Sequence, residues 1–435
     1  MNSGQSKEIL VLGGVTHNNR GDLAMMEGLF AHLRQISPDV DPILYSWNPE
    51  VSRRIFKVEC RPSPDPHISN QFAKRSSRLL AIFHIGWFLL RFALFHFVSY
   101  RAARVCTNSN LLAFFAQLSR SSAVVIHGSG SFNSYWWYDW VYPKTACAIA
   151  ARISGKPVLL TSQGVGPFKN IFDKFVAAAF FRTATFLGVR DGSESADVMR
   201  KLGARSDHIW QTGDDALPLP ELSSGEATAL LAAEGLNSAE MMIGVNMRDA
   251  SAYASSFSET GLDKIAISLT AIAERYRARL VFIPISYDSF DDDRKSAEKI
   301  ASMIGTHVPI TIVRNERSAA ELRELISHFQ ICVGTSYHFL LFALNANVPS
   351  IGLFRNDYYR QKQTGLLGLF GQAEQCVDAT EISVAELTER IDRLMAERAS
   401  LSPAIKKVNS ALAEKARNAH ARFAQIINAK LANPI

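Results

Sequence analysis

Residues 123–130 read AVVIHGSG, a run of four apolar residues, a histidine and a turn that contains two glycines. A short apolar run that ends in such a turn is typical of a strand buried in a parallel sheet. The same pattern occurs at residues 9–14 (ILVLGG), which precede helical spacing at 23–34, and at residues 157–167 (PVLLTSQGVGP). Repeated units of strand, glycine-rich turn and helix predict the α/β class, with a doubly wound parallel sheet covered by helices on both faces.

A second series of apolar runs begins after residue 237. Its members are residues 242–245, 280–285, 310–313, 331–333 and 350–353. The intervening stretch 218–237 is rich in Pro and Ser and is predicted to be a linker. We therefore predict two Rossmann-like domains, residues 1–220 and 238–400, with a central cleft, followed by a polar helix in residues 401–435 that starts near Pro403. In such folds, ligands bind outside the carboxyl ends of the strands.

The composition of the 435-residue chain excludes several classes of protein. With 47% hydrophobic and 20% charged residues, the chain has enough apolar material for folded cores and is not a disordered protein. Its five cysteines are scattered and form no CxxC pair, which argues against a disulfide scaffold and favours a reducing cytosol. The net charge of +6 suits an acidic substrate or an anionic membrane surface, and no basic patch supports a nucleic-acid partner.

No metal site is predicted, because no cluster of His, Asp and Glu has the spacing of metal ligands. The acidic run Asp291-Asp292-Asp293 is interpreted as the solvated start of a helix.

An apolar insertion at about residues 70–110 complicates the cytosolic prediction. Residues 79–98 read LLAIFHIGWFLLRFALFHFV, which is long enough to span a bilayer. A span is disfavoured because Arg91 would lie near the bilayer midplane, and because basic residues flank both ends and give no direction. A span would also place motifs that are predicted to share one site on opposite sides of the membrane.

Two alternatives remain for residues 79–98. One is a helix buried in the first domain, and the other is a helix in the membrane interface, with its aromatic side chains inserted and the flanking Arg and Lys on lipid phosphates. The many aromatic residues within 79–98, between two basic flanks, favour the interfacial helix. We expect Trp87, Phe88 and Phe95 to lie on an open surface, with Phe92 and Phe97 also inserted. The predicted location is therefore cytoplasmic and peripheral, on the inner face of the cell membrane.

Polar and glycine-rich motifs follow most of the predicted strands. In residues 18–22 (NNRGD), Asp22 is either the N-cap of the next helix or a catalytic carboxylate. Residues 127–131 (HGSGS) and 162–167 (SQGVGP) carry glycines that allow a ligand to approach the backbone, where N–H groups hold phosphate or carboxylate.

Cationic residues lie at other strand ends. Arg190 (in VRD) and Arg248 (in NMR) are each either part of a structural ion pair or a clamp for an anion. Residues 334–338 (GTSYH) open a helix over 339–345, which places His338 in the first helical turn. Residues 358–362 (YYRQK) are predicted to form a basic loop.

The order of these motifs, together with Gly213-Asp214-Asp215 and residues 347–352 (NVPSIG), resembles the polysaccharide pyruvyl transferase family from about Ile9 to Gly371. The resemblance implies a shape like that of GT-B glycosyltransferases. It also implies transfer of the enolpyruvyl unit of phosphoenolpyruvate to two sugar hydroxyls, which gives a cyclic ketal and phosphate. Phosphoenolpyruvate is then a substrate, no cofactor is required, and the acceptor is a glycan of a cell-surface polysaccharide or its lipid-linked precursor.

The resemblance also suggests roles for individual residues. His338 is the candidate acid that protonates the vinyl carbon, and Asp22 is the candidate base or hydroxyl-orienting group. The candidate substrate-binding residues are Arg190, Arg248, Ser336, Tyr337, Lys362, Gly128, Gly130, Asn18 and Gln163.

One position departs from the pattern of the family. Many members carry Arg two residues before the histidine, as in the motif SRxH. The corresponding residue of this chain, two residues before His338, is Ser336. Arg248 or Arg355 is expected to supply the missing cation. The alternatives are a different donor, a GT-B glycosyltransferase that uses a nucleotide sugar, and a non-catalytic homologue in polysaccharide assembly.

Overall fold

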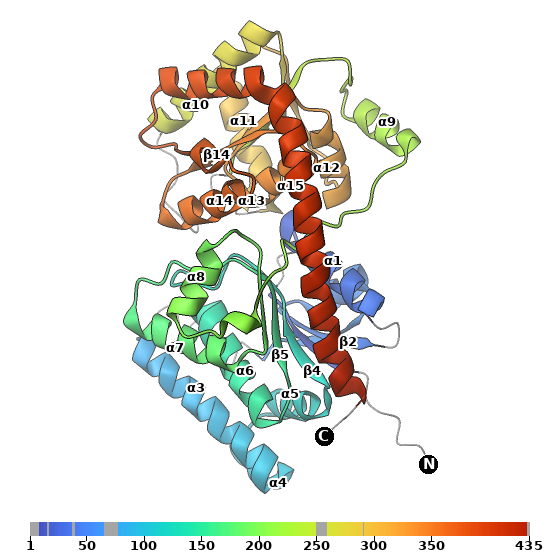
Figure 1. Ribbon diagram of the computed structural model, residues 1–435, viewed down its shortest axis with the longest axis vertical. Helices are drawn as coiled ribbons and strands as arrows, with labels where there is room; N and C mark the ends of the chain where they lie inside the picture. The colour runs from blue at the N-terminus through green and yellow to red at the C-terminus, as the bar shows by residue number, and fades with distance from the viewer. Residues whose placement is uncertain are drawn as a thin grey trace. The chain divides into compact units, whose positions relative to one another are not determined.

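The computed structural model describes residues 8–14, 17–36, 40–64, 77–248, 259–289 and 291–432. The chain divides into two compact units (Figure 1). The first unit comprises residues 1–15, 25–215 and 414–435, and the second comprises residues 16–24 and 216–413. The short segment 16–24 therefore leaves the first sheet and joins the second unit before the chain returns.

The first unit is built on a seven-stranded sheet in which every neighbouring pair of strands is parallel. The spatial order is β3 (Glu59–Pro62), β2 (Asp41–Ser46), β1 (Glu8–Leu12), β4 (Ala123–Ile126), β5 (Val158–Gln163), β6 (Phe186–Val189) and β7 (Ile209–Gln211). The strand order reverses between β1 and β4, the central pair, and both are almost entirely buried. Such a reversal is the topological switch point of a doubly wound fold.

The helices of the first unit supply the rest of its core. They are α1 (Arg20–Ile36), α2 (Pro49–Phe56), α3 (Arg78–Ala93), α4 (Tyr100–Arg104), α5 (Ser109–Arg120), α6 (Tyr142–Ile153), α7 (Ile171–Thr183) and α8 (Glu194–Lys201). Asparagine side chains accept backbone N–H groups at the N-termini of α5 (Asn108) and α7 (Asn170), as N-caps do.

The second unit repeats this architecture with six parallel strands. Their order is β12 (Ile310–Ile312), β9 (Arg279–Phe282), β8 (Met242–Asn246), β13 (Ile331–Gly334), β14 (Ser350–Phe354) and β15 (Cys376–Asp378). Its helices are α9 (Ser224–Ala233), α10 (Glu259–Tyr276), α11 (Asp293–Ile304), α12 (Ala319–Ser327), α13 (Tyr337–Asn345) and α14 (Asp357–Leu369). A small antiparallel pair, β10 (Tyr287–Asp288) and β11 (Asp291–Asp292), lies outside the main sheet. The α/β class with two Rossmann-like domains is thus confirmed.

Three local predictions were wrong, and helix capping explains two of them. The predicted linker 218–237 contains α9, whose N-terminus is fixed by a reciprocal capping box between Ser223 and Glu226. The predicted loop 358–362 lies inside α14, because the Asn356 side chain accepts the N–H of Tyr359 and starts the helix there. The acidic run does start a helix, as predicted, since Asp292 caps α11, but it is not solvated, because Asp291 and Asp293 are buried.

The last helix, α15 (Val384–Ala432), is longer than the predicted one and contains Pro403 in its interior. The turns before Pro403 stay helical because Leu387, Ile391 and Leu394 are buried in the core of the second unit. Packing of this apolar stripe outweighs the hydrogen bond that proline removes.

The apolar insertion forms α3 and a π-helical turn, Leu94–Val98. In Figure 1, α3 (light blue) lies along the outside of the first unit beside α6 and α7. The expectation that Trp87, Phe88 and Phe95 share an open surface was wrong for two of the three residues. Trp87 is exposed, but Phe88 is fully buried and Phe95 packs against the core, because both rings contact Phe115.

Candidate active site

In the second unit, the switch point lies between β8 and β13, which are neighbours in the sheet. Asn246, at the end of β8, joins three of the surrounding segments. Its Nδ2 donates to the Ile283 carbonyl (2.8 Å) and to Asp293 (3.0 Å), and its Oδ1 accepts the N–H of Ser336 (3.1 Å). These bonds hold the loops after β8, β9 and β13 together at one edge of the sheet.

Arg248 is fixed at this edge by partners on two other segments. Its backbone N–H donates to Thr335 Oγ1 (2.7 Å), and its guanidinium donates from Nε to Asp291 Oδ2 (2.7 Å). Burial opposes the charge, but the carboxylates of Asp291 and Asp293 raise the pKa of Arg248. Burial raises the pKa of Asp293 to about 6, although the charge of Arg248 acts in the opposite direction. The structure thus forms an ion-paired guanidinium where the sequence left open an ion pair or an anion clamp.

Two further cations follow β14, Arg355 directly after the strand and Lys362 in α14. Arg355 Nη2 donates to the Arg248 carbonyl (3.0 Å), so the residue proposed to replace the missing arginine is adjacent to Arg248. Lys362 Nζ donates to the Tyr358 hydroxyl (3.3 Å) and lies 5.4 Å from the centroid of the Tyr337 ring. Cationic groups from three segments therefore gather around the start of α13.

His338 is in the first turn of α13, as predicted, and is buried. A Cβ atom on Gly21 would lie 2.0 Å from both Cγ and Nδ1 of its ring, so only glycine allows this approach. The motif at residues 18–22 and the motif at residues 334–338 therefore meet within the second unit, although more than three hundred residues separate them in the sequence.

Residues 18–20 are held in place by backbone and side-chain bonds. The N–H of Arg20 donates to the Ile285 carbonyl (2.9 Å), and the N–H of Tyr287 donates to the Asn18 carbonyl (2.8 Å). The Arg20 guanidinium lies over the Tyr287 ring and pairs with Glu316 (2.6 Å). This anchoring fixes the position of Gly21 against His338.

Asp22 is not the N-cap of α1. The side chain of Asn19 has that role, because its Oδ1 accepts the N–H groups of Gly21 (3.0 Å) and Asp22 (3.2 Å). The Asp22 side chain is therefore a half-buried carboxylate in the first turn of α1, one residue from the glycine that contacts His338.

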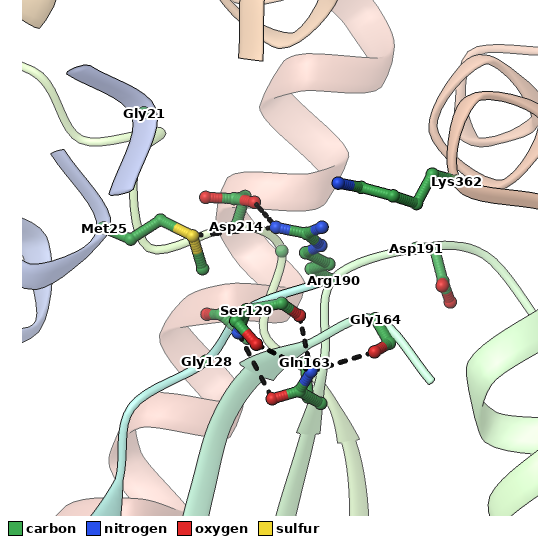
Figure 2. Close-up of polar contacts among 12 residues, drawn as sticks. Gly21, Met25, Gly128, Ser129, Gln163, Gly164, Arg190, Asp191, Asp214 and Lys362 are labelled. Carbon is green, nitrogen blue, oxygen red and sulfur yellow. Dashed lines mark hydrogen bonds and ion pairs between the residues drawn. The ribbon is translucent and has the colours of Figure 1, made fainter. Parts of the chain in front are cut away.

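The first unit holds a second cluster, at the carboxyl ends of β4, β5, β6 and β7 (Figure 2). Arg190, after β6, donates from Nη1 to Asp214 Oδ2 (3.0 Å), and the two side chains are 2% and 1% exposed. The carboxylate of Asp191, the next residue, accepts the N–H of Ser195 (3.1 Å) at the start of α8. Burial raises the pKa of Asp191 to about 6, and its bonds to Ser195 act against that shift.

Gln163 holds the glycine-rich turn that contains Gly128 and Gly130. Its Oε1 accepts the N–H of Ser129 (3.2 Å), and its Nε2 donates to the carbonyls of Ser129 (2.5 Å) and Gly164 (2.9 Å), as Figure 2 shows. Gly128 is required for a close approach, because a Cβ atom there would lie 2.1 Å from the Thr161 carbonyl oxygen. These contacts position the turn, and contact of Gly128, Gly130 or Gln163 with a substrate stays a prediction.

Two buried titratable groups beside this turn carry shifted pKa values. Burial, with the charges of Lys144 and Arg190, lowers the pKa of His127 to about 3, so its imidazole is neutral at physiological pH. Neither His127 ring nitrogen has a hydrogen-bond partner among the described residues. Burial raises the pKa of Asp215 to about 7, against hydrogen bonds from Ser162 and Thr161.

Asp215 should make the stability of the protein depend on pH. The carboxyl keeps its proton in the folded state up to about pH 7, whereas its unfolded value is 3.8, so its contribution to stability is lost as the pH rises through about 7. We expect the unfolding free energy of wild type to fall by about 2 kcal/mol more than that of Asp215→Asn between about pH 5 and pH 8. Urea unfolding of both proteins at the two pH values measures this difference. The contributions of the other carboxyls with shifted pKa values are the same in both proteins and cancel in the comparison. Asp263→Asn, on the exposed side of α10, is the matched control, and an equal pH response of Asp215→Asn and wild type would contradict the prediction.

The sequence-predicted residues thus fall into two groups. Asn18, Asp22, Arg248, Ser336, Tyr337, His338 and Lys362 lie in the second unit, and Gly128, Gly130, Gln163 and Arg190 lie in the first. Sequence reasoning assigned no role to Asp214, Asp291 and Asp293, which pair with or face the two arginines. No local signal in the sequence indicated that Asp291 and Asp293, on either side of the Asp292 cap, would be buried. Within the described residues, no group of three His, Cys, Asp or Glu side chains could hold a metal ion.

The contact between Gly21 and His338 gives a direct prediction. We expect Gly21→Ala to lower the turnover of a donor by about tenfold or more, because the methyl group displaces the imidazole from its position. Gly225→Ala is the matched control, since a Cβ atom on that α9 glycine meets nothing within 4 Å. Steady-state rates of both variants, with their melting temperatures, separate a displaced His338 from general unfolding. Wild-type turnover by a folded Gly21→Ala protein would mean that the position of the ring does not matter.

Comparison with known proteins agrees with this architecture. A sequence model described as polysaccharide pyruvyl transferase matches residues 19–358. The amylovoran biosynthesis protein AmsJ of Erwinia amylovora is 21% identical over 404 residues, which cover 89% of this chain and 92% of AmsJ.

Solved structures of GT-B glycosyltransferases and epimerases share the fold. A glycosyltransferase from Rickettsia africae has a TM-score of 0.57 at 12% identity, with 98% of this chain and 99% of that chain covered. The S. aureus MnaA–UDP co-structure has a TM-score of 0.56 at 12% identity, with 92% and 90% covered. Because the family match extends from the Asn19 cap, through both strand-end clusters, to α14, this chain belongs to the polysaccharide pyruvyl transferase family.

Proposed function

We propose that this protein transfers the pyruvyl unit of phosphoenolpyruvate to two hydroxyls of one sugar in an exopolysaccharide or its lipid-linked precursor. The family match and the likeness to an exopolysaccharide biosynthesis protein support this proposal. The observation that carries it is the meeting of residues 18–22 with residues 334–338, next to Arg248 and Arg355, at the switch point of the second sheet.

The reaction needs one proton donor and one proton acceptor. The vinyl carbon of the donor gains a proton and becomes a methyl group, and positive charge develops on the neighbouring carbon. Two sugar oxygens form bonds to that carbon, and its bond to the phosphate oxygen breaks. The two hydroxyls release two protons. One of them restores the acid that protonated the vinyl carbon, and the other leaves with phosphate. The transfer therefore requires no oxidant or reductant.

His338 is the proposed acid. It lies in the first turn of α13, and the backbone of Gly21 limits where its ring can lie. A positioned imidazole can donate a proton to a carbon only if its geometry is fixed, because carbon is a poor hydrogen-bond acceptor. Asp22 is the proposed base or orienting group for a sugar hydroxyl, since its carboxylate follows Gly21 directly on the same helix.

Arg248, Arg355 and Lys362 are proposed to bind the donor. Phosphoenolpyruvate carries a phosphate and a carboxylate, and guanidinium groups bind both with paired hydrogen bonds. The adjacency of Arg355 to Arg248 supports the proposal that Arg355 supplies the cation that Ser336 lacks. Asp291 keeps Arg248 oriented, and the donor would compete with that carboxylate for part of the guanidinium. Ser336, Tyr337 and Asn18 are proposed to line the same site, and Arg190 is proposed to bind substrate in the first unit.

Ligand-dependent melting tests the choice of donor. We expect phosphoenolpyruvate to raise the melting temperature of the protein and UDP-glucose to leave it unchanged, because binding to the folded state stabilises it. The Lys362→Ala variant should need a higher concentration of phosphoenolpyruvate for the same rise. Stabilisation by UDP-glucose and not by phosphoenolpyruvate would instead favour a nucleotide-sugar glycosyltransferase.

A further inference from the structure

The outer face of α3 is an exposed apolar surface. Leu79, Phe83, Trp87 and Leu90 recur at helical spacing on this face, and Phe83 is 67% exposed. The opposite face, which carries Ala81, Ile85, Phe88 and Phe92, is buried in the core of the first unit. The helix is therefore apolar on both faces, and only one face packs against protein among the described residues.

Helix α7 extends this surface. Arg78 at the start of α3 pairs with the buried Asp173 of α7 (2.8 Å), which brings the two helix N-termini together. Ile171 and Phe175, on either side of Asp173 in the sequence, are both exposed, and Phe175 is 66% exposed. We call the exposed side chains of Leu79, Leu80, Phe83, Trp87, Leu90, Phe97, Ile171 and Phe175 the apolar face.

The charges around the apolar face have one dominant sign. Residues 66–138 contain no Asp or Glu and seven Lys or Arg. Within the described residues, Arg101 and Arg104 of α4 and Lys169 and Lys174 near the start of α7 are exposed. An apolar surface bordered by cations is complementary to a bilayer of anionic lipid, in which acyl chains lie below phosphate groups.

The packing of α3 against the core of the first unit favours a helix that lies on a membrane over one that crosses it. By length and composition alone, Arg78–Val98 is the one helix in the described part of the chain that could span a bilayer. A span would expose Phe88 and Phe92, whose rings lie 5.3 Å and 5.1 Å from that of Phe115 in the core. It would also have to carry Arg91, whose guanidinium lies over the Trp87 ring at 5.5 Å.

We propose that the apolar face docks the protein on an anionic phospholipid bilayer, with α3 parallel to the membrane plane. Contiguous apolar surface of this kind is rare on soluble proteins that have no partner for it. The proposal does not depend on the donor or the reaction, because it concerns only where the first unit binds.

Vesicle co-sedimentation tests the proposal. Wild-type protein should bind vesicles of phosphatidylcholine with phosphatidylglycerol, and should bind pure phosphatidylcholine vesicles much more weakly. The double variant Phe83→Ser and Leu90→Ser should lose binding by about tenfold or more without a change in melting temperature, because both side chains are exposed. Ile267→Ser, which replaces an exposed apolar residue of α10 in the second unit, is the matched control and should bind like wild type.

The charged border has its own variant. Arg101→Glu with Arg104→Glu should weaken binding to the anionic vesicles, because two of the bordering cations become anions. Arg398→Glu, on α15, should have little effect. Failure of wild type to bind anionic vesicles would overturn the proposal, as would unchanged binding of the Phe83 and Leu90 double variant. Retention in membranes after alkaline carbonate extraction would mean that α3 spans, and a dimer that the double variant abolishes would mean that a second copy covers the face.

Discussion

His338→Gln should lower the rate of phosphate release from phosphoenolpyruvate by about 10²–10⁴ while the protein stays folded. Glutamine keeps much of the volume and polarity of histidine but cannot donate a proton to carbon at a useful rate. The ring that it replaces is enclosed by Gly21, Tyr337 and Phe342, so a side chain of similar size is needed to keep α13 in place. The effect should be on kcat more than on KM, because the proton transfer occurs only in the transition state.

The matched control for this result is His328→Gln. His328 lies in the same unit, where it follows α12 and its Nε2 lies 3.3 Å from Glu324, and none of the contacts described for the candidate site involves it. It should keep wild-type turnover. If His338→Gln turns over the donor as fast as His328→Gln does, the acid is another group and the role proposed for His338 is wrong.

The second large effect concerns stability. Arg190→Met should lower the unfolding free energy by about 3–5 kcal/mol, because it leaves the carboxylate of Asp214 buried without its cation. The same substitution is also expected to weaken substrate binding. The activity of Arg190→Met must therefore be compared with that of a variant of equal stability. Urea unfolding measures the loss directly.

A double variant separates the two roles of Arg190. Arg190→Met with Asp214→Leu removes both buried charges and should recover most of the lost stability, while turnover stays low if Arg190 binds substrate. The exposed pair of Arg200 and Asp197 supplies the control, since Arg200→Met should cost less than about 1 kcal/mol. A single Arg190→Met variant as stable as Arg200→Met would contradict the assignment of a buried ion pair.

The central strands of both sheets could be predicted because they are buried on both faces. Residues 9–12, 123–126 and 331–333 are continuous apolar runs, a pattern that few other structures produce. Both edge strands of the first sheet were missed for the opposite reason: β3 (ECRP) and β7 (IWQ) are short, polar in part and only partly buried. Their pairing is determined by the neighbouring strand more than by their own sequence.

The candidate site was predicted in part. His338 follows from a strand, a short turn and a helix in close succession, all of which are local features. The contact of Gly21 with His338 does not follow from local features, because backbone bonds of Arg20 with Ile285 and of Asn18 with Tyr287 hold residues 18–20 in the second unit. The burial of Asp291 and Asp293 could not be predicted either, since a run of three aspartates is usually solvated unless a cation such as Arg248 faces it.

The measurement that tests this account most directly is the fate of phosphoenolpyruvate labelled with carbon-13 at its vinyl carbon, in the presence of the protein and a glycan acceptor. We predict that the label appears as the methyl group of a sugar ketal, in a one-to-one ratio with released phosphate, and that the His338→Gln protein forms neither product at a comparable rate. A protein that leaves the labelled donor intact, while transferring a sugar from a nucleotide sugar to the same acceptor, would contradict the account.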